Sequence, residues 1–249
     1  MLWRHAGWKP AIQQVWKPAL QQLHAHQSCF FISNSSDELR MKTVFTLLVI
    51  TLAFFAYFHF HRPITYPPGV LIDSDPVQIP AGKAEQIIKH GDYQLTPLAH
   101  FSFDARILHR KAYPYDQSAK LAPVDLALGW RAMSDQAVLD KLKISQSVRF
   151  YWYEYRTPPI PKDQIISHST NLHVIPATSA IASFCKSLRQ GELVHFEGEL
   201  VEATGPKIGT WRSSLSRTDT GNGACELMLV EVCSKLNLTP KESGRLVQR

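Results

Sequence analysis

The chain has 249 residues, of which 45% are hydrophobic and 19% are charged, and its formal net charge is +6. This composition is that of a folded globular protein with one additional apolar segment, and it excludes an intrinsically disordered chain. The positive charge is too small for a chain of this length to favour nucleic acid as a partner.

The first forty residues differ in character from everything that follows. They contain two near-identical octapeptides, WKPAIQQV and WKPALQQL, which are too few copies for a repeat architecture. Met41 and Lys42 directly precede a long apolar run, which is the usual beginning of a signal-anchor. We therefore expect residues 1–40 to be a non-native or disordered leader, with translation beginning at Met41. A short cytosolic tail is the alternative.

The apolar run TVFTLLVITLAFFAYFHF, Thr43 to Phe60, contains no charged residue and as a helix would span about 27 Å. It predicts a transmembrane anchor at 43–60, in contact with the lipid bilayer. The run ends in aromatic residues and histidines rather than in a small-x-small cleavage site, so the anchor is expected to remain uncleaved. Arg40 and Lys42 precede the span, which favours an inward amino terminus. In a Gram-negative cell this predicts a single-pass inner-membrane protein with a periplasmic carboxy-terminal domain.

Prolines dominate the segment after the anchor, RPITYPPGVLIDSDPVQIP. Proline fixes φ and removes a backbone donor, so residues 61–99 are predicted to form a Pro-rich spacer followed by a short helix or turn within Gly82 to Ala99.

A β-rich globular domain is predicted over 100–236, followed by a flexible tail at 237–249. Alternating apolar residues indicate strands in FSFDARILHR, RFYWYEYR and ELVHFEGELVEA. The segments TWRSSLSR and ACELMLVEVCSKL are predicted to pair as a hairpin about the turn TDTGNG, whose glycines permit positive φ.

Two helices are predicted between the strands. One covers Ser134 to Leu142 with Ser134 as its N-cap, and the other covers Ala177 to Gly191 and presents Ile181, Phe184, Cys185 and Leu188 on one face. This order predicts an α+β, β-rich fold: a small barrel resembling an OB-type fold with one or two helices, preceded by a single transmembrane helix.

Four segments together resemble a family of uncharacterised, single-pass membrane-anchored proteins of Gram-negative bacteria. They are PVDLALGWRAMSD, ISQSVRFYW, HSTNLHVIPA and WRSSLSRTDTGNGACELMLVE, and the likeness extends roughly from Phe101 to Val232. The resemblance implies a location in the envelope and carries no known activity.

The segment ISHSTNLHVIPA places His168 and His173 five residues apart. An odd separation puts them on opposite faces of a strand, so no metal site is predicted. Ser167, Ser169, Asn171 and His173 share the polar face in this interpretation. An alternative hypothesis is an envelope hydrolase with His168 or His173 as general base and Asp219 or Glu197 nearby. Asp219 begins the triplet of aspartic proteases, but it occurs once and lies in a polar turn.

The preferred hypothesis is a non-enzymatic binding or structural module of the cell envelope, with an envelope protein or glycan as partner and no cofactor. An OB-type nucleic-acid binder using the aromatic run Phe150 to Tyr155 is a second alternative, which the expected compartment disfavours. Buried free thiols are expected at Cys185, Cys225 and Cys233. The candidate binding surface consists of Trp152, Ser169, Asn171, His173, Arg217, Asp219 and Asn222.

Overall fold

The computed structural model describes residues 37–58, 62–82 and 86–237, in two compact units that divide after His61. The expected leader, apart from its last four residues, and the expected tail, apart from residue 237, lie outside the described residues.

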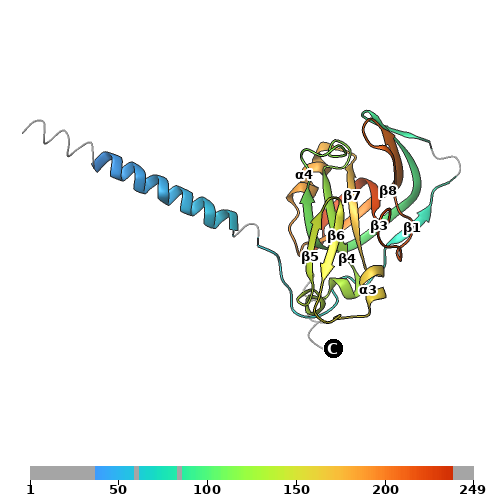
Figure 1. Ribbon diagram of the computed structural model, residues 1–249, viewed down its shortest axis with the longest axis horizontal. Coiled ribbons are helices and arrows are strands. Elements are labelled where there is room, and N and C mark those ends of the chain that lie inside the picture. Colours follow the sequence, from blue (N-terminus) through green and yellow to red (C-terminus); the bar gives the residue numbers. More distant parts are fainter. Residues whose placement is uncertain (1–36, 59–61, 83–85, 238–249) are drawn as a thin grey trace, which may run out of the picture. The chain divides into compact units, whose positions relative to one another are not determined.

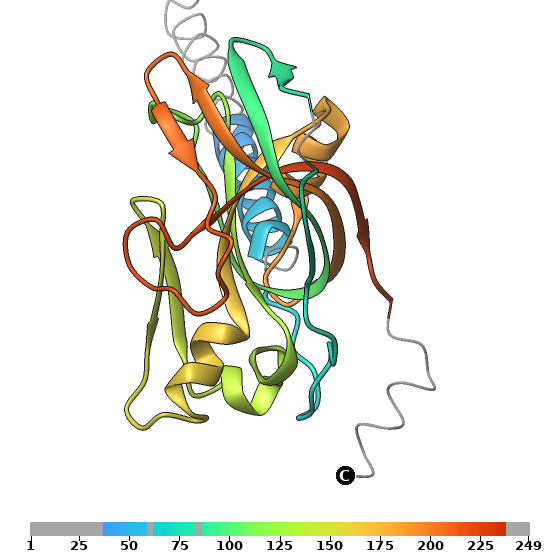
Figure 2. The ribbon, with the colours of Figure 1, turned by 90° about the vertical axis from the view of Figure 1, so that its right-hand side faces the viewer.

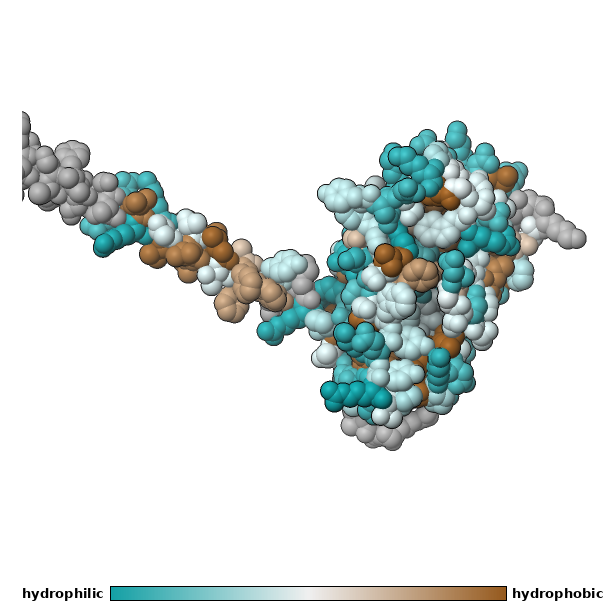
Figure 3. Space-filling view, in the orientation of Figure 1, coloured by the Kyte–Doolittle hydropathy of each residue, from teal (hydrophilic) through white to brown (hydrophobic). Residues whose placement is uncertain are grey.

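The first unit contains the helix Asp37–Phe58, which has 22 residues, a mean hydropathy of 1.9 and no buried side chains. At about 1.5 Å per residue it is long enough to cross a bilayer. The hydroxyls of Thr43, Thr46 and Thr51 each donate to the carbonyl four residues earlier, which makes these polar side chains compatible with lipid. Hydrophobic side chains follow the visible face of this helix (Figure 3).

The globular unit begins well before residue 100, so residues 62–99 are not a free spacer. The Ile64 amide donates to the Gln190 carbonyl at 2.8 Å, and Tyr66, Leu71 and Ile72 pack against the main core. Of the helix or turn expected within Gly82 to Ala99, the helix is wrong: the described residues contain strand β2 (Ile88–His90), a turn at Gly91 and Asp92, and the beginning of β3 (Tyr93–Ala112). The prolines exclude a helix as expected, but the apolar residues between them are buried rather than solvated.

A mixed sheet of eight strands forms the domain (Figure 1). Its ladders connect β3 to β4, β4 to β7, β7 to β10, β10 to β8 and β8 back to β3; all are antiparallel except β7 with β10. The twenty-residue β3 makes this order possible, because residues 94–106 pair with β8 and residues 106–112 pair with β4. The remaining strands are β1 (Val77–Pro80), β4 (Val124–Gly129), β7 (Ser169–Pro176), β8 (Leu193–Gly205), β9 (Gly209–Arg212) and β10 (Glu226–Lys235).

Helix α4 (Ser179–Ser187) lies between β7 and β8 in sequence and covers one end of the sheet (Figure 1). Thr178 caps it by accepting a hydrogen bond from the Ile181 amide. The apolar face predicted for this helix is confirmed, because Ile181, Phe184, Cys185 and Leu188 all pack into the main core. The helix ends earlier than predicted, since Leu188 has an extended backbone.

An insertion separates β4 from β7 and packs on the outer side of the sheet. It contains η2 (Arg131–Ser134), α2 (Gln136–Leu139), the hairpin of β5 (Lys143–Ser147) with β6 (Phe150–Glu154), and α3 (Lys162–Ser167). Asp135, rather than Ser134, caps α2. Because α3 precedes β7, Ser167 lies in a helix and His168 at its end, and the strand predicted through them is wrong.

The hairpin predicted between TWRSSLSR and ACELMLVEVCSKL is also wrong. Strand β9 pairs with β8, whereas β10 pairs with β7 and β8. The tight turn lies instead at Gly205 to Gly209, where Lys207 has φ +68°. The glycines of TDTGNG belong to a longer loop that connects β9 to β10.

Gly191 attaches the first residues of the globular unit to the sheet. It has φ +92°, and a Cβ there would lie 2.0 Å from the Ile64 carbonyl oxygen, whereas Gly221 has φ +87° and open space around it. Gly191→Ala is expected to lower the free energy of unfolding by about 3 kcal/mol and Gly221→Ala by about 1 kcal/mol, because only the first adds a collision to the strain of positive φ. Urea unfolding of both variants in detergent, followed by tryptophan fluorescence, measures the difference; equal losses would contradict the contact.

Candidate functional site

Two adjoining pockets lie where the β3–β4 loop meets strand β9 and the loop after it. The first, the histidine pocket, has a volume of about 470 Å³, and the second, the lysine pocket, about 640 Å³. Gln117 and Lys207 line both pockets, so the two are neighbours along one groove. The main side chains of the histidine pocket come from Arg149, Phe150, His173, Lys207, Trp211, Arg212, Asn222 and Cys225.

Arg149 enters the histidine pocket from the tip of the β5–β6 hairpin. Both central residues of this two-residue turn have positive φ, +45° at Val148 and +69° at Arg149, without a glycine at either position. A β-branched residue in this region is strained, so the side-chain contacts of the turn must compensate. The hairpin tip lies beside the β9–β10 loop (Figure 2).

The Arg149 guanidinium supplies those contacts. It makes two hydrogen bonds to Asp116, of 2.6 and 2.8 Å, and one of 2.8 Å each to the Asp125 carboxylate and the Ala122 carbonyl. Its centre also lies 3.9 Å from the ring centroid of Tyr113. One arginine therefore joins the insertion to β4 and to the β3–β4 loop.

Asp125 is fully buried on β4, and His173 lies opposite it on β7. The same oxygen, Asp125 Oδ1, receives Arg149 and lies 2.9 Å from His173 Nδ1. The His173 contact is close but not aligned as a hydrogen bond, and Asp125 Oδ2 has no partner among the described residues. Since Nδ1 faces Asp125, Nε2 is the ring nitrogen that is left for an occupant of the pocket.

Asn171 connects the Arg149 backbone to Cys225. Its amide nitrogen donates to the Arg149 carbonyl at 3.0 Å and lies 3.6 Å from Cys225 Sγ, while its oxygen accepts a 2.6 Å bond from Gln146. Gln146 in turn contacts His109 on β3. This network fixes the side chains beside the thiol. Burial raises the pKa of Cys225 to about 11, so its resting form at neutral pH is the thiol.

Trp211 of β9 forms another wall of the pocket. Its ring centroid lies 4.7 Å from that of His173 and 6.0 Å from the Arg149 guanidinium. A flat indole beside an imidazole and a guanidinium gives a surface on which a sugar ring or a planar group can stack.

A second buried polar contact holds the β9–β10 loop in place. Glu226, the first residue of β10, lies 2.6 Å from Arg217 Nη1. Burial raises the pKa of Glu226 to about 8, against the attraction of Arg217. Asp219, whose carboxylate accepts a 2.6 Å bond from Ser214, closes the loop locally. Cys225 is therefore placed by residues on both sides of it in the sequence.

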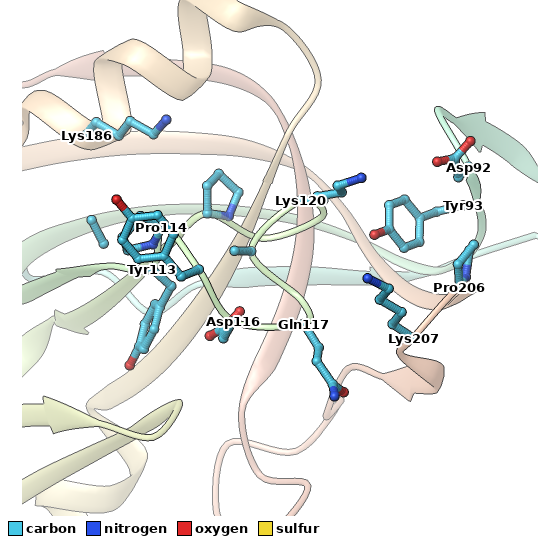
Figure 4. A pocket seen from close by; sticks show the side chains of 14 residues that line it. Asp92, Tyr93, Tyr113, Pro114, Asp116, Gln117, Lys120, Lys186, Pro206 and Lys207 are labelled. Carbon is cyan, nitrogen blue, oxygen red and sulfur yellow. The ribbon is translucent and has the colours of Figure 1, made fainter.

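The lysine pocket is a different chemical environment. Lys120, Lys186 and Lys207 reach it from the β3–β4 loop, from α4 and from the β8–β9 turn (Figure 4). None of the three amines has an ion-pair or hydrogen-bond partner in the part of the chain that the structure describes. Asp116, the acidic residue at the centre of the view, is already paired with Arg149. Asp92 also lines the pocket, so three unpaired amines face one carboxylate that is not held by Arg149, beside the rings of Tyr93 and Tyr113.

The structure separates the residues of the hydrolase hypothesis. His173 lies at the pocket with Asp125 as its carboxylate partner, whereas Asp219 bonds Ser214 and Glu197 contacts His100 and His195 on the β3–β8 ladder. His168 ends α3, and its carbonyl accepts from Trp130 at the opposite end of β7 from His173. Burial lowers the pKa of His168.

The predicted binding surface is divided in the same way. His173 and Asn222 line the histidine pocket, and Asn171 lies beside it. Ser169 bonds the Ile165 carbonyl, Trp152 is half exposed on β6, and Arg217 pairs with Glu226. Sequence reasoning missed Asp125, Arg149, Trp211, Lys207 and the proximity of Cys225 to His173. Asp125 alone carried a usable signal, as the one acid within the apolar stretch PVDLALG.

Among the described residues, no group of three or more His, Cys, Asp or Glu side chains is arranged to hold a metal ion. Comparisons with protein-family models, with curated proteins and with solved structures gave no match to this chain.

Arg149 offers a test of the site's construction. Arg149→Lys cannot contact Asp116, Asp125 and the Ala122 carbonyl together, and it leaves a buried carboxylate short of partners, so a loss of about 3 kcal/mol in the free energy of unfolding is expected. Arg212→Lys, which alters the exposed pair with Glu202, should cost less than about 1 kcal/mol. Denaturation curves of the two variants, measured in parallel, give both changes in the free energy of unfolding. Similar decreases in the two variants would show that the Arg149 network contributes no special stability.

Proposed function

We propose that the chain is a single-pass protein of the Gram-negative inner membrane that presents an OB-type domain in the periplasm. In this role the groove formed by the histidine and lysine pockets binds a carboxylate-bearing glycan or peptide of the envelope. The observation that carries the proposal is the set of three unpaired lysines beside an aromatic and arginine-lined pocket.

The OB-type assignment is supported by the order of pairing. In chain order, β3, β4, β7, β8 and β10 are the first to fifth strands of this arrangement. The first strand pairs with the second, and the second with the third. The third pairs with the fifth, the fifth with the fourth, and the fourth with the first. A helix, α4, lies between the third and the fourth strand. In OB-type barrels ligands bind at the loops after the first and the fourth strands, which here are the β3–β4 loop and the segment from β8 to β10. Both pockets lie there.

The chemistry of the groove favours an anionic ligand with rings or planar groups. Free lysines attract carboxylates from a distance, and the walls at Trp211 and Tyr113 provide stacking surfaces. A nucleic-acid platform on the aromatic run is less well supported, because Tyr151, Tyr153 and Tyr155 are partly buried against Leu108, Ile165 and their neighbours.

The location is tested by producing the protein from Met41 with a reporter after Arg249. The apolar helix and the upstream Lys42 should retain the protein in the membrane fraction with the carboxy terminus outward. Alkaline phosphatase should therefore be active and green fluorescent protein dark in paired fusions. A soluble product, or the opposite reporter pattern, refutes the envelope location.

Ligand binding is tested with soluble peptidoglycan fragments that retain their stem-peptide carboxylates, using the full protein in detergent. We expect binding that weakens with salt and at least about tenfold weaker binding by Lys120→Gln/Lys186→Gln/Lys207→Gln, since each lost charge contributes a fraction of the total. The matched control removes Lys141, Lys143 and Lys162, which are exposed on the insertion. Amidated fragments should lose affinity to the same degree as the triple variant. Equal affinity for amidated and unamidated fragments, or tighter binding of single-stranded DNA, would refute the proposal.

A further inference from the structure

The histidine pocket contains more than a binding surface requires: a thiol, an imidazole and a buried carboxylate lie at one wall of it. We infer that Cys225 is the nucleophile of an acyl-transfer site, with His173 as its proton acceptor, acting on an ester or amide of a carboxylate-bearing ligand. The inference rests on the proposed function for the class of substrate, and on the geometry of the pocket for the chemistry.

The strand register places the thiol and the imidazole at the same wall of the pocket, with the resting thiol donating to the Arg149 carbonyl at 3.9 Å. In the parallel ladder Glu226 lies beside Leu172 and Leu227 beside His173, and Cys225 directly precedes Glu226. Cys225 Sγ contacts the amide of Asn171, the residue two positions before His173 on the same face of β7. Such neighbours on one face are separated by about 6.6 Å along the strand. Both side chains line the same pocket.

The second observation is the state of His173 and Asp125. The His173 side chain is only 4% exposed and that of Asp125 is fully buried, yet neither His173 Nδ1 nor Asp125 Oδ2 has an aligned hydrogen bond. Buried polar groups without partners are costly and need an explanation. A proton taken up by His173 would convert its contact with Asp125 into an ion pair, so the arrangement favours His173 as a base during a reaction.

The remaining residues suit the same reaction. Gly223 lines the pocket beside Asn222 and has open space where a Cβ would stand, so a substrate backbone can approach there. Lys207 lines both pockets and can hold a substrate carboxylate next to the bond that reacts. Asn171 and Asp125 are positioning residues, because they act through the thiol and the imidazole.

The proposed step balances without a cofactor. His173 Nε2 accepts the thiol proton as sulfur attacks the carbonyl carbon; the C–S bond forms, the C–O or C–N bond breaks, and His173 passes the proton to the leaving alkoxide or amine. Water then attacks the thioester, giving its proton to His173, and the thiolate that leaves recovers that proton. The net reaction is hydrolysis of the ester or amide to an acid and an alcohol or amine.

The thiol's protonation determines the expected kinetics. With the pKa of Cys225 raised to about 11 by burial, little thiolate exists at pH 7, so the thiol must transfer its proton during attack. Acylation should therefore require His173 as the proton acceptor and should not need prior ionisation of the thiol.

The test uses p-nitrophenyl acetate with the full protein in detergent, because this acyl donor needs no specific recognition. We expect a burst of about one equivalent of nitrophenolate and an acetyl group on Cys225, located by peptide mass spectrometry. Cys225→Ala should abolish the burst, and His173→Gln should slow it by about 100-fold or more. Cys233→Ala is the matched control, since it removes a partly exposed thiol outside the pocket and should change nothing.

The outcomes separate this inference from the proposed function. A burst that persists in Cys225→Ala overturns the acyl-transfer inference, as does acylation of Cys225 at an unchanged rate and pH profile in His173→Gln protein with native tryptophan fluorescence. If Cys225→Ala and His173→Gln still bind peptidoglycan fragments while the wild type shows no burst, the pocket is a binding site only. If the burst is present and the fragments do not bind, the acyl-transfer chemistry stands and the proposed ligand is wrong.

Discussion

The site depends on one buried charge, the carboxylate of Asp125. An ionised carboxylate with no exposed surface is stable in a protein only when paired charges and hydrogen bonds replace its water. Arg149 supplies this from the tip of the β5–β6 hairpin, and it can do so only if Val148 and Arg149 accept a strained backbone. The position of the hairpin, the closure of the pocket and the contact of His173 with Asp125 therefore follow from a single electrostatic requirement.

This requirement also explains why the insertion between β4 and β7 is part of the site. The hairpin covers polar side chains of β7 that would otherwise face solvent, and Gln146 and the Arg149 carbonyl satisfy both ends of the Asn171 amide. On the other side, the pair of Glu226 with Arg217 fixes the loop that leads to Cys225. The contacts of Arg149 with Asp125 and of Arg217 with Glu226, on different elements, thus support the wall of the pocket that carries His173 and Cys225.

The sequence predicted the elements whose pattern is local. The apolar helix follows from composition, and the strands with strict alternation and the buried face of α4 follow from periodicity, although the helix begins at Asp37 and β3 at Tyr93, earlier than the predicted segments. The predictions from sequence failed where strand pairing is not local. Strand β10 pairs with β7 across more than fifty residues of chain, and no turn signal can reveal such a pairing. The glycines of TDTGNG suggested a hairpin between β9 and β10, whereas β9 pairs with β8. The prolines after the apolar helix were interpreted as a spacer because proline predicts an extended backbone but not whether Tyr66 and Ile72 are buried.

The candidate site was less predictable than the fold for the same reason. His173 was selected from its polar neighbours, but its carboxylate partner comes from β4, and its neighbouring thiol precedes β10. Each of these residues looks ordinary in its own segment, and only the order of strands makes them adjacent. The isolated acid of PVDLALG was the exception, because a charge within an apolar strand implies a buried partner of opposite sign.

Binding and chemistry make opposite demands on such a pocket. Free lysines must remain solvated to attract an anionic ligand, whereas a buried thiol is protected from oxidation and alkylation but loses the thiolate that makes it reactive. The groove separates the two demands in space, with the unpaired amines in the lysine pocket and the partly buried Cys225 in the histidine pocket. Lys207, which lines both, is the residue through which a carboxylate bound by one pocket would place its neighbouring carbonyl in the other.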